Sequence, residues 1–170
     1  MHRADGVVVV RRSAERKAKP SVAQNVNRSG FAISQLYVRR VKADPELYEP
    51  YKRAARITRK RACDLALADA LCPPVIRNVD MSAYTGKAGE GIHIDAVDNF
   101  AIHSVHVRLD LIDGTLIEEG VAVCDIQLAL WVYVTQSILS PGTAVVVHIT
   151  ALDGPGNAAI KTLHHVPAAV

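Results

Sequence analysis

The chain has 170 residues, of which 49% are hydrophobic and 22% are charged, and it carries a net charge of +3. This apolar fraction is typical of globular proteins and excludes wholesale disorder, because disordered chains lack the apolar surface that offsets chain entropy. The longest unbroken apolar run, residues 128–134, is far shorter than a membrane-spanning helix requires. We therefore expect a folded protein that has no membrane among its partners.

The charge is divided unevenly along the chain. Residues 1–74 contain 16 Lys and Arg against 7 Asp and Glu, whereas residues 75–170 contain 4 against 10. The two halves therefore carry net charges of +9 and −6, which indicates two structural units. Either the basic half binds a polyanion, or the opposite charges attract each other across an interface within one chain or between copies. We favour the second interpretation.

The first 20 residues are expected to form an arm and a linker. The valine run at residues 7–10 is short and β-prone, so it is predicted to be an edge strand or an arm that pairs elsewhere. Residues 13–20 are rich in Lys and Arg and poor in apolar side chains, which is typical of an exposed linker.

Residues 21–74 are predicted to form a helical hairpin with a basic outer surface. Ser21 and Gln24 have the spacing of a capping box, which starts the first helix. Apolar residues and one glycine then recur at spacings of three and four, as on one helical face: Val22, Val26, Gly30, Ile33, Tyr37 and Val41.

A tight turn at Asp44 and Pro45 is expected to join the two helices. Asp44 fits the N-cap of the second helix and Pro45 fits its first position. The second helical pattern runs from Tyr51 to Leu71, and the prolines at 73–74 stop it.

After residue 74 the period of the apolar pattern changes from 3.6 to 2, which predicts strands. Apolar residues alternate with polar ones at 92–96 and again at 105–111, and Asp113-Gly114 is a hairpin signal. A return strand is expected at 116–123, and further strands at 128–134, 143–151 and 158–165. The fold class is therefore α+β, a helical hairpin followed by an antiparallel sandwich of about seven strands over residues 75–170.

Several strand and turn motifs of this second half follow one another in a recognisable order. They are Ser104–Leu109 with Asp113-Gly114, then Trp131, then Gly142 ahead of Thr143–Thr150, and finally Ile149–Asn157 with its Ala-x-Asp stretch and Gly-Asn turn. Over residues 75–165 these motifs resemble bacterial immunoglobulin-like and fibronectin type III-like sandwich modules. The resemblance implies an immunoglobulin-like fold and no particular activity.

The helical half departs from those modules, which do not usually carry a basic hairpin in front. Its first helix is similar to uncharacterised bacterial and phage-associated proteins at Gln24, Asn27, Arg28 and Phe31.

Metal-binding residue types gather at 93–106, as His93, Asp95, Asp98, His103 and His106. His93 and Asp95 share one face of a predicted strand and are weak metal candidates, whereas His103 and His106 are expected on opposite faces. A cryptic metal-dependent enzyme site among His93, Asp95 and His106 is one alternative. Polar residues on the outer face of a sandwich are the simpler interpretation, so we expect no metal and no cofactor.

Asp153 and Asn157 have oxygen ligands of the kind that calcium takes from loops. Turn chemistry alone explains both residues, because Asp and Asn side chains stabilise turns. Cys63, Cys72 and Cys124 contain no C-x-x-C pair, which excludes a disulfide framework and a zinc motif and favours a reducing, cytoplasmic location.

The basic segment 52–61 is the best lead to a binding function. Its stripe of cations is a candidate polyanion site, formed by Lys52, Arg53, Arg56, Arg59 and Lys60. No nucleophile–base motif was found, so we expect no catalytic residue and no enzyme. The sequence favours a bacterial structural or protein-interaction protein that self-associates into a homo-oligomer, with nucleic-acid binding as the alternative.

Overall fold

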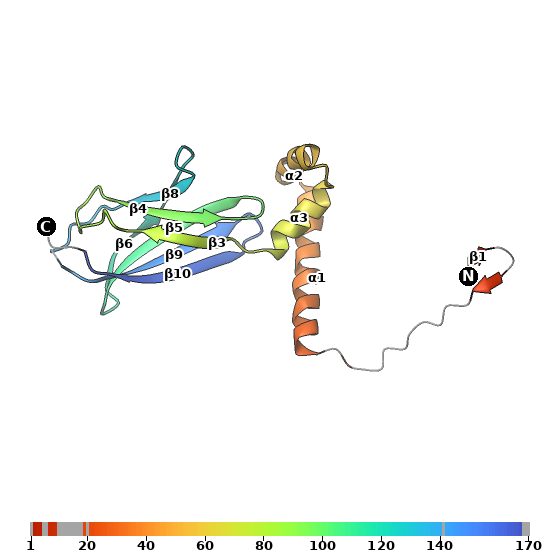
Figure 1. Cartoon of the computed structure of the whole chain (residues 1–170), viewed down its shortest axis with the longest axis horizontal. Helices are drawn as coiled ribbons and strands as arrows, with labels where there is room; N and C mark the ends of the chain where they lie inside the picture. Colours follow the sequence, from red (N-terminus) through yellow and green to blue (C-terminus); the bar gives the residue numbers. More distant parts are fainter. Residues whose placement is uncertain (1, 5–6, 10–18, 20, 141, 168–170) are drawn as a thin grey trace.

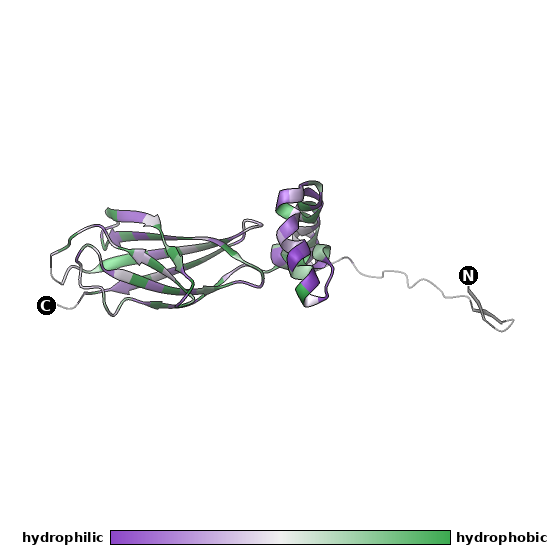
Figure 2. Cartoon of the chain, turned by 90° about the horizontal axis from the view of Figure 1, so that it is seen from above, coloured by the Kyte–Doolittle hydropathy of each residue, from purple (hydrophilic) through white to green (hydrophobic). Residues whose placement is uncertain are grey.

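The computed structural model describes residues 2–4, 7–9, 19, 21–140 and 142–167. Three helices precede two four-stranded antiparallel sheets, which confirms the α+β class (Figure 1). The helices form a block at one end of the elongated sandwich, as the view from above also shows (Figure 2). No helix in the described ranges is long and apolar enough to cross a bilayer.

The valine run pairs with the start of the chain. Strand β2 (Val7–Val9) is antiparallel to β1 (His2–Ala4) in a two-stranded sheet of their own. Of the two alternatives, an edge strand or an arm that pairs elsewhere, residues 7–9 therefore correspond to the second. Val10 and most of the expected linker, apart from residue 19, lie outside the described residues.

The helical unit contains three helices where a hairpin of two was predicted. They are α1 (Val22–Ala43), α2 (Pro45–Thr58) and α3 (Ala62–Leu71). Arg59 adopts a left-handed conformation with φ of 56° and ends α2, and the chain restarts as a helix after Arg61. Periodicity did not reveal this break because the apolar spacing continues across it.

The predicted helix boundaries around the first two helices are confirmed. Ser21 and Gln24 form the capping box of α1, with the Ser21 Oγ accepting from the Gln24 N–H at 3.2 Å. Asp44 caps α2 by accepting from the N–H groups of Glu46 and Leu47, and Pro45 occupies the first turn.

Within α1, only the second half of the helix buries side chains in the core of the helical unit. Val38 and Val41 join Tyr51 of α2 and Ala66 of α3 in a small core. Val22, Val26 and Ile33 were predicted on the packed face but are exposed. The first half of α1, which contains Val22 and Val26, extends beyond the other two helices in Figure 1, so those helices do not cover these two side chains.

The sandwich has eight strands, one more than expected. They are β3 (Val75–Asp80), β4 (Gly91–Val97), β5 (Ile102–Leu111), β6 (Leu116–Val121), β7 (Val123–Asp125), β8 (Leu130–Val134), β9 (Val145–Asp153) and β10 (Ala158–His165). One sheet has the order β3–β4–β8–β7 and the other the order β10–β9–β5–β6. Alternate residues of β4, β5 and β9 face inward and form the core between the sheets.

Two of these strands were not predicted individually: β3, to which no predicted segment corresponds, and β7, because the return segment 116–123 is divided between the two sheets. β6 pairs with β5, whereas β7 pairs with β8 in the opposite sheet. Ala122 is buried between them and donates its N–H to the Val105 carbonyl. The chain therefore changes sheets at Ala122, which alternation in the sequence did not indicate.

Candidate functional site

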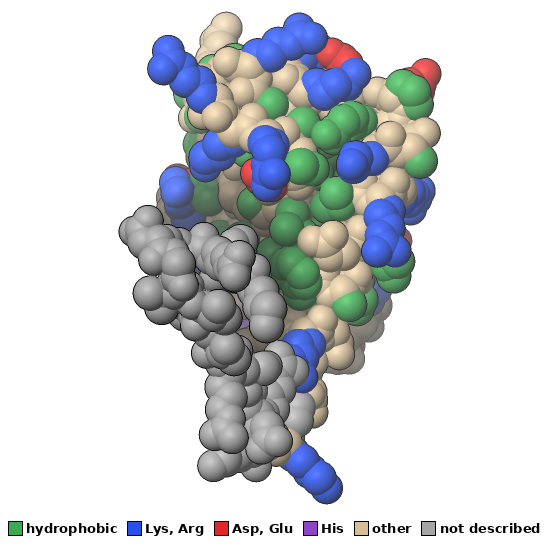
Figure 3. Space-filling model, turned by 90° about the vertical axis from the view of Figure 1, so that its right-hand side faces the viewer, with side chains coloured by type: hydrophobic (Ala, Val, Ile, Leu, Met, Phe, Trp, Pro, Cys, Tyr) green, Lys and Arg blue, Asp and Glu red, His purple; other side chains and the backbone are tan. Residues whose placement is uncertain are grey.

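The helical unit exposes apolar side chains on the side that faces away from the sandwich (Figure 3). Lys and Arg side chains surround these apolar groups, and few acidic groups are visible there. On α1 the exposed apolar residues Val22, Val26, Ile33 and Leu36 form what we call the α1 stripe. Spacings of four, seven and three place them on one side of the helix.

Four of the five predicted polyanion-binding residues are exposed cations. Lys52 is the exception, because its Nζ lies 2.6 Å from the Glu49 carboxylate and 5.9 Å from the centre of the Tyr48 ring. The Lys52 ammonium holds the pKa of Glu49 below its ordinary value. Within the described part of the chain, no carboxylate lies within ion-pair distance of the other four, Arg53, Arg56, Arg59 and Lys60.

The sandwich has its own open hollow, which we call the β6–β8 groove. Its volume is about 740 Å³, and Asp125 is the charged residue in its lining. The groove contains no Lys or Arg, and it is lined by Gly120, Val121, Val123, Cys124, Asp125, Ile126, Gln127, Val132, Tyr133, Val134 and Gln136. Val123 and Ile126 are 73% and 88% exposed, so the groove presents aliphatic surface to solvent.

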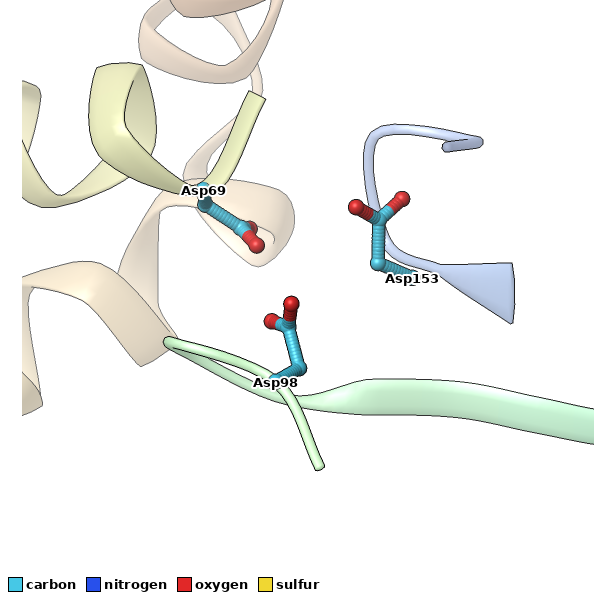
Figure 4. A group of neighbouring side chains, drawn as sticks. All are labelled: Asp69, Asp98 and Asp153. Carbon is cyan, nitrogen blue, oxygen red and sulfur yellow. The ribbon is translucent and has the colours of Figure 1, made fainter. Parts of the chain in front are cut away.

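Three aspartates meet where the helices join the sandwich (Figure 4), and we call them the acidic triad. Asp69 lies in the last turn of α3, Asp98 follows β4, and Asp153 ends β9. One carboxylate oxygen of each lies within 4.8 Å of the others. The sequence analysis treated Asp98 and Asp153 separately and did not consider Asp69, since nothing in the sequence links segments so far apart.

Hydrogen bonds fix one oxygen of Asp69 and one of Asp98, and both oxygens of Asp153, whose Oδ2 accepts from the Asn157 side-chain amide at 2.7 Å. The Tyr51 hydroxyl donates to Asp69 Oδ2, and the backbone N–H groups of Phe100 and Ala101 donate to Asp98 Oδ2 at 2.9 and 3.0 Å. Asp153 Oδ1 accepts in the same way from the N–H groups of Gly156 and Asn157, at 2.8 and 2.6 Å. The turns that carry Asp98 and Asp153 therefore hold their carboxylates in defined positions.

The environment of Asp69 disfavours its charged form. Burial raises the pKa of Asp69 to about 6, and the neighbouring charges of Asp98 and Asp153 raise it further, whereas the hydrogen bond from Tyr51 lowers it. Tyr51 also has a raised pKa, first because of burial and then because it donates to Asp69.

Polar and aromatic contacts dock the helical unit on the sandwich around this triad. The Asn99 Nδ2 donates at 2.9 Å to the Ala68 carbonyl near the end of α3, which also accepts the backbone N–H of Cys72. The rings of Tyr51 and Phe100 stack with their centroids 4.3 Å apart. The end of α3 and the two sandwich turns therefore form one continuous junction.

The structure does not assemble the predicted His93 and Asp95 into a larger cluster. Both are half-buried on β4, where Asp80 of β3 lies across from His93, but in the described ranges they belong to no group of three side chains whose ligand atoms could meet at one metal ion. His103 and His106 are both exposed on β5, where a register shift between Ile102 and Ser104 alters the alternation.

His106 lies beside an open hollow of about 460 Å³ on the outer face of the β10–β9–β5–β6 sheet. There Asp110 is buried and accepts from Arg108 Nε at 2.9 Å, and His148 Nε2 lies 3.4 Å from it. The other ring nitrogen of His148 lies 3.1 Å from the Thr162 hydroxyl.

Comparisons with known proteins give structural similarity and no family. No protein-family model and no curated protein matches the chain. Among solved structures, the chain is similar to CopC from Methylosinus trichosporium OB3b, with a TM-score of 0.41 and 14% identity. That similarity covers 55% of this chain and 91% of CopC.

Proposed function

We propose that this protein is a non-enzymatic interaction module whose copies associate head to tail. In this arrangement the α1 stripe and the surrounding cations of one copy bind the β6–β8 groove of the next. The proposal rests on the observation that both surfaces expose aliphatic side chains, that Lys and Arg surround the apolar groups of the helical unit, and that the charged residue of the groove lining, Asp125, is acidic. Exposed apolar surface favours association, and complementary charge selects the partner.

The charge distribution supports a second copy as the partner. The helical half of the chain carries +9 and the half that forms the sandwich carries −6. The outer face of the helical unit points away from its own sandwich, so it is available to the acidic sandwich of another molecule (Figure 1). An interface between two different surfaces of one chain generates rings or filaments.

The strand order supports the proposal that the sandwich, which contains the β6–β8 groove, is immunoglobulin-like. The orders β3–β4–β8–β7 and β10–β9–β5–β6 correspond to the A–B–E–D and G–F–C–C′ sheets of that fold. In the described structure Cys63, Cys72 and Cys124 are free thiols, which supports a reducing compartment such as the bacterial cytoplasm.

A complementation experiment tests the head-to-tail contact. Ile33→Asp places a charge in the α1 stripe and Val123→Asp places one in the groove, at side chains that are 68% and 73% exposed. Each variant alone is expected to be monomeric in analytical ultracentrifugation. An equimolar mixture is expected to form dimers and nothing larger, because each variant retains one intact surface.

The matched control is Ile138→Asp, at a side chain that is 78% exposed and lies outside both surfaces. It is expected to assemble like the natural chain. A natural chain that stays monomeric at every concentration contradicts the proposal. So does a Val123→Asp variant that assembles normally, which would point to a symmetric contact between helices.

Nucleic-acid binding is the second candidate, and the exposed Arg53, Arg56, Arg59 and Lys60 favour it. A basic stripe that tracks phosphates binds less tightly as salt rises, because counterions compete for the phosphates. A gel shift with duplex DNA and RNA is expected to show retention that Arg53→Glu with Arg56→Glu abolishes. A chain that leaves both nucleic acids unshifted at low salt removes this candidate.

A further inference from the structure

Negative charge is buried in the acidic triad without a compensating cation from the described residues. Asp69 and Asp153 are 1% and 3% exposed, and no described Lys, Arg or His forms an ion pair with any of the three aspartates. Asp69 also lies in the last turn of α3, where the helix dipole disfavours negative charge and no basic residue is present. Such a group of carboxylates is stable when a bound cation neutralises it.

Two oxygens of the triad have no hydrogen-bond partner. Asp69 Oδ1 and Asp98 Oδ1 are both inaccessible to solvent and unpaired in the described structure. Figure 4 shows the side chains of Asp69, Asp98 and Asp153 directed toward one another from three separate segments. Because an unsatisfied buried acceptor is unfavourable, these oxygens point to a ligand that receives their lone pairs.

We propose that the acidic triad binds one calcium ion at the junction of the helical unit and the sandwich. Calcium takes oxygen ligands at about 2.3–2.6 Å, so ligands on opposite sides of the ion lie about 5 Å apart. The oxygens of the triad lie within 4.8 Å of one another, which matches this spacing. The triad offers oxygen alone, whereas zinc and copper sites use nitrogen or sulfur ligands.

The surroundings of the triad favour binding of the ion. A hollow of about 390 Å³, lined in part by Tyr51, Asp69 and Phe100, adjoins the triad on the side of Asp69. The hydrogen bonds to Asp98 Oδ2 and Asp153 Oδ1 position these carboxylates in advance. The ion joins α3 to two turns of the sandwich, so its binding stabilises the junction.

Calorimetry and thermal unfolding of the full chain test this site. The chain is freed of metal with a chelator, dialysed and titrated with calcium chloride. One saturable calcium site per chain is expected, and the Tm is expected to rise with calcium concentration, because a ligand of the folded state stabilises it by mass action. A titration without saturable heat, or a Tm that calcium does not change, overturns the proposal.

Two matched substitutions locate the ion. Asp98→Asn keeps an oxygen that accepts from Phe100 and Ala101 but removes a charge, and it is expected to weaken calcium binding by about tenfold or more. The control Asp113→Asn alters an aspartate that likewise accepts from a backbone N–H group, in the turn after β5, and is expected to bind calcium normally.

If Asp98→Asn does not fold, a third variant tests the same calcium site. Asp69→Asn retains an acceptor for the Tyr51 hydroxyl and is expected to fold and to lose the calcium-dependent rise in Tm. Calcium binding by both triad variants with the affinity of Asp113→Asn contradicts the proposed site. None of these results depends on head-to-tail association, because the triad belongs to neither the α1 stripe nor the β6–β8 groove.

Discussion

Asp69 is the residue whose charge most affects the junction between helices and sandwich. Its carboxylate is buried beside Asp98 and Asp153, and the hydroxyl of Tyr51, which in turn contacts Tyr37, supports it. Burial, together with the charges of Asp98 and Asp153, raises the pKa of Asp69 from 3.8 to about 6 in the folded protein, although the hydrogen bond from Tyr51 lowers it. The charged form therefore destabilises the metal-free fold at neutral pH.

Asp69→Asn is expected to stabilise the metal-free protein at pH 7. A carboxyl group with a raised folded pKa binds its proton more tightly in the folded state, so the natural chain gains stability as pH falls from about 6 toward 4. The variant has no such group and does not share this gain. Its advantage is expected to be up to about 3 kcal/mol at pH 7, from a shift of about two pKa units, and to vanish near pH 4.

Urea unfolding in the presence of a chelator, repeated between pH 4 and pH 7, measures the difference in the free energy of unfolding between the natural chain and Asp69→Asn. Asp125→Asn serves as the control, because its carboxylate lies outside the junction. A variant that is less stable than the natural chain at pH 7 contradicts the prediction.

At the scale of elements, Asp44 links two helices. It is the C-cap of α1 and the N-cap of α2, where its Oδ1 accepts from the N–H groups of Glu46 and Leu47 at 2.9 and 3.2 Å. Asp44→Ala is expected to lower the free energy of unfolding by about 1 kcal/mol, because two backbone donors lose their partner. Chemical denaturation measures this loss.

The conservative substitution Asp44→Asn is the control for this cap. Asn also accepts hydrogen bonds from a helix start, so the variant is expected to retain most of the stability. Equal losses in Asp44→Ala and Asp44→Asn would show that charge, not the hydrogen bonds, accounts for the effect.

The elements also show where periodicity succeeds and fails. Alternation placed Ile92, Ile94 and the inward face of β5 in the core, because strands of a sandwich bury every second residue. Helical spacing did not predict which side chains of α1 are buried. A helix buries the side that its neighbours cover, and α2 and α3 cover Val38 and Val41 but not Val22. The break at Arg59 had no signal in the apolar pattern.

At the scale of the whole molecule, opposite charge is concentrated at the two ends of an elongated chain (Figure 1). Head-to-tail association is therefore expected to weaken as salt rises, because ions screen exposed charges over about 10 Å at 0.1 M. Sedimentation velocity at low and high salt measures this change. Association that is unchanged or stronger at high salt would indicate a contact driven by apolar surface alone, without the proposed charge complementarity.

The amino-acid sequence by itself determined the change from helices to strands after the double proline, the caps at Ser21 and Asp44, and the division of charge. These features depend on residues close together in the chain, so spacing and residue type are enough to define them. The tertiary structure decided which helical side chains stay exposed, where the chain changes sheets, and that Asp69, Asp98 and Asp153 meet. Each of these depends on contacts between distant segments, which local periodicity does not encode.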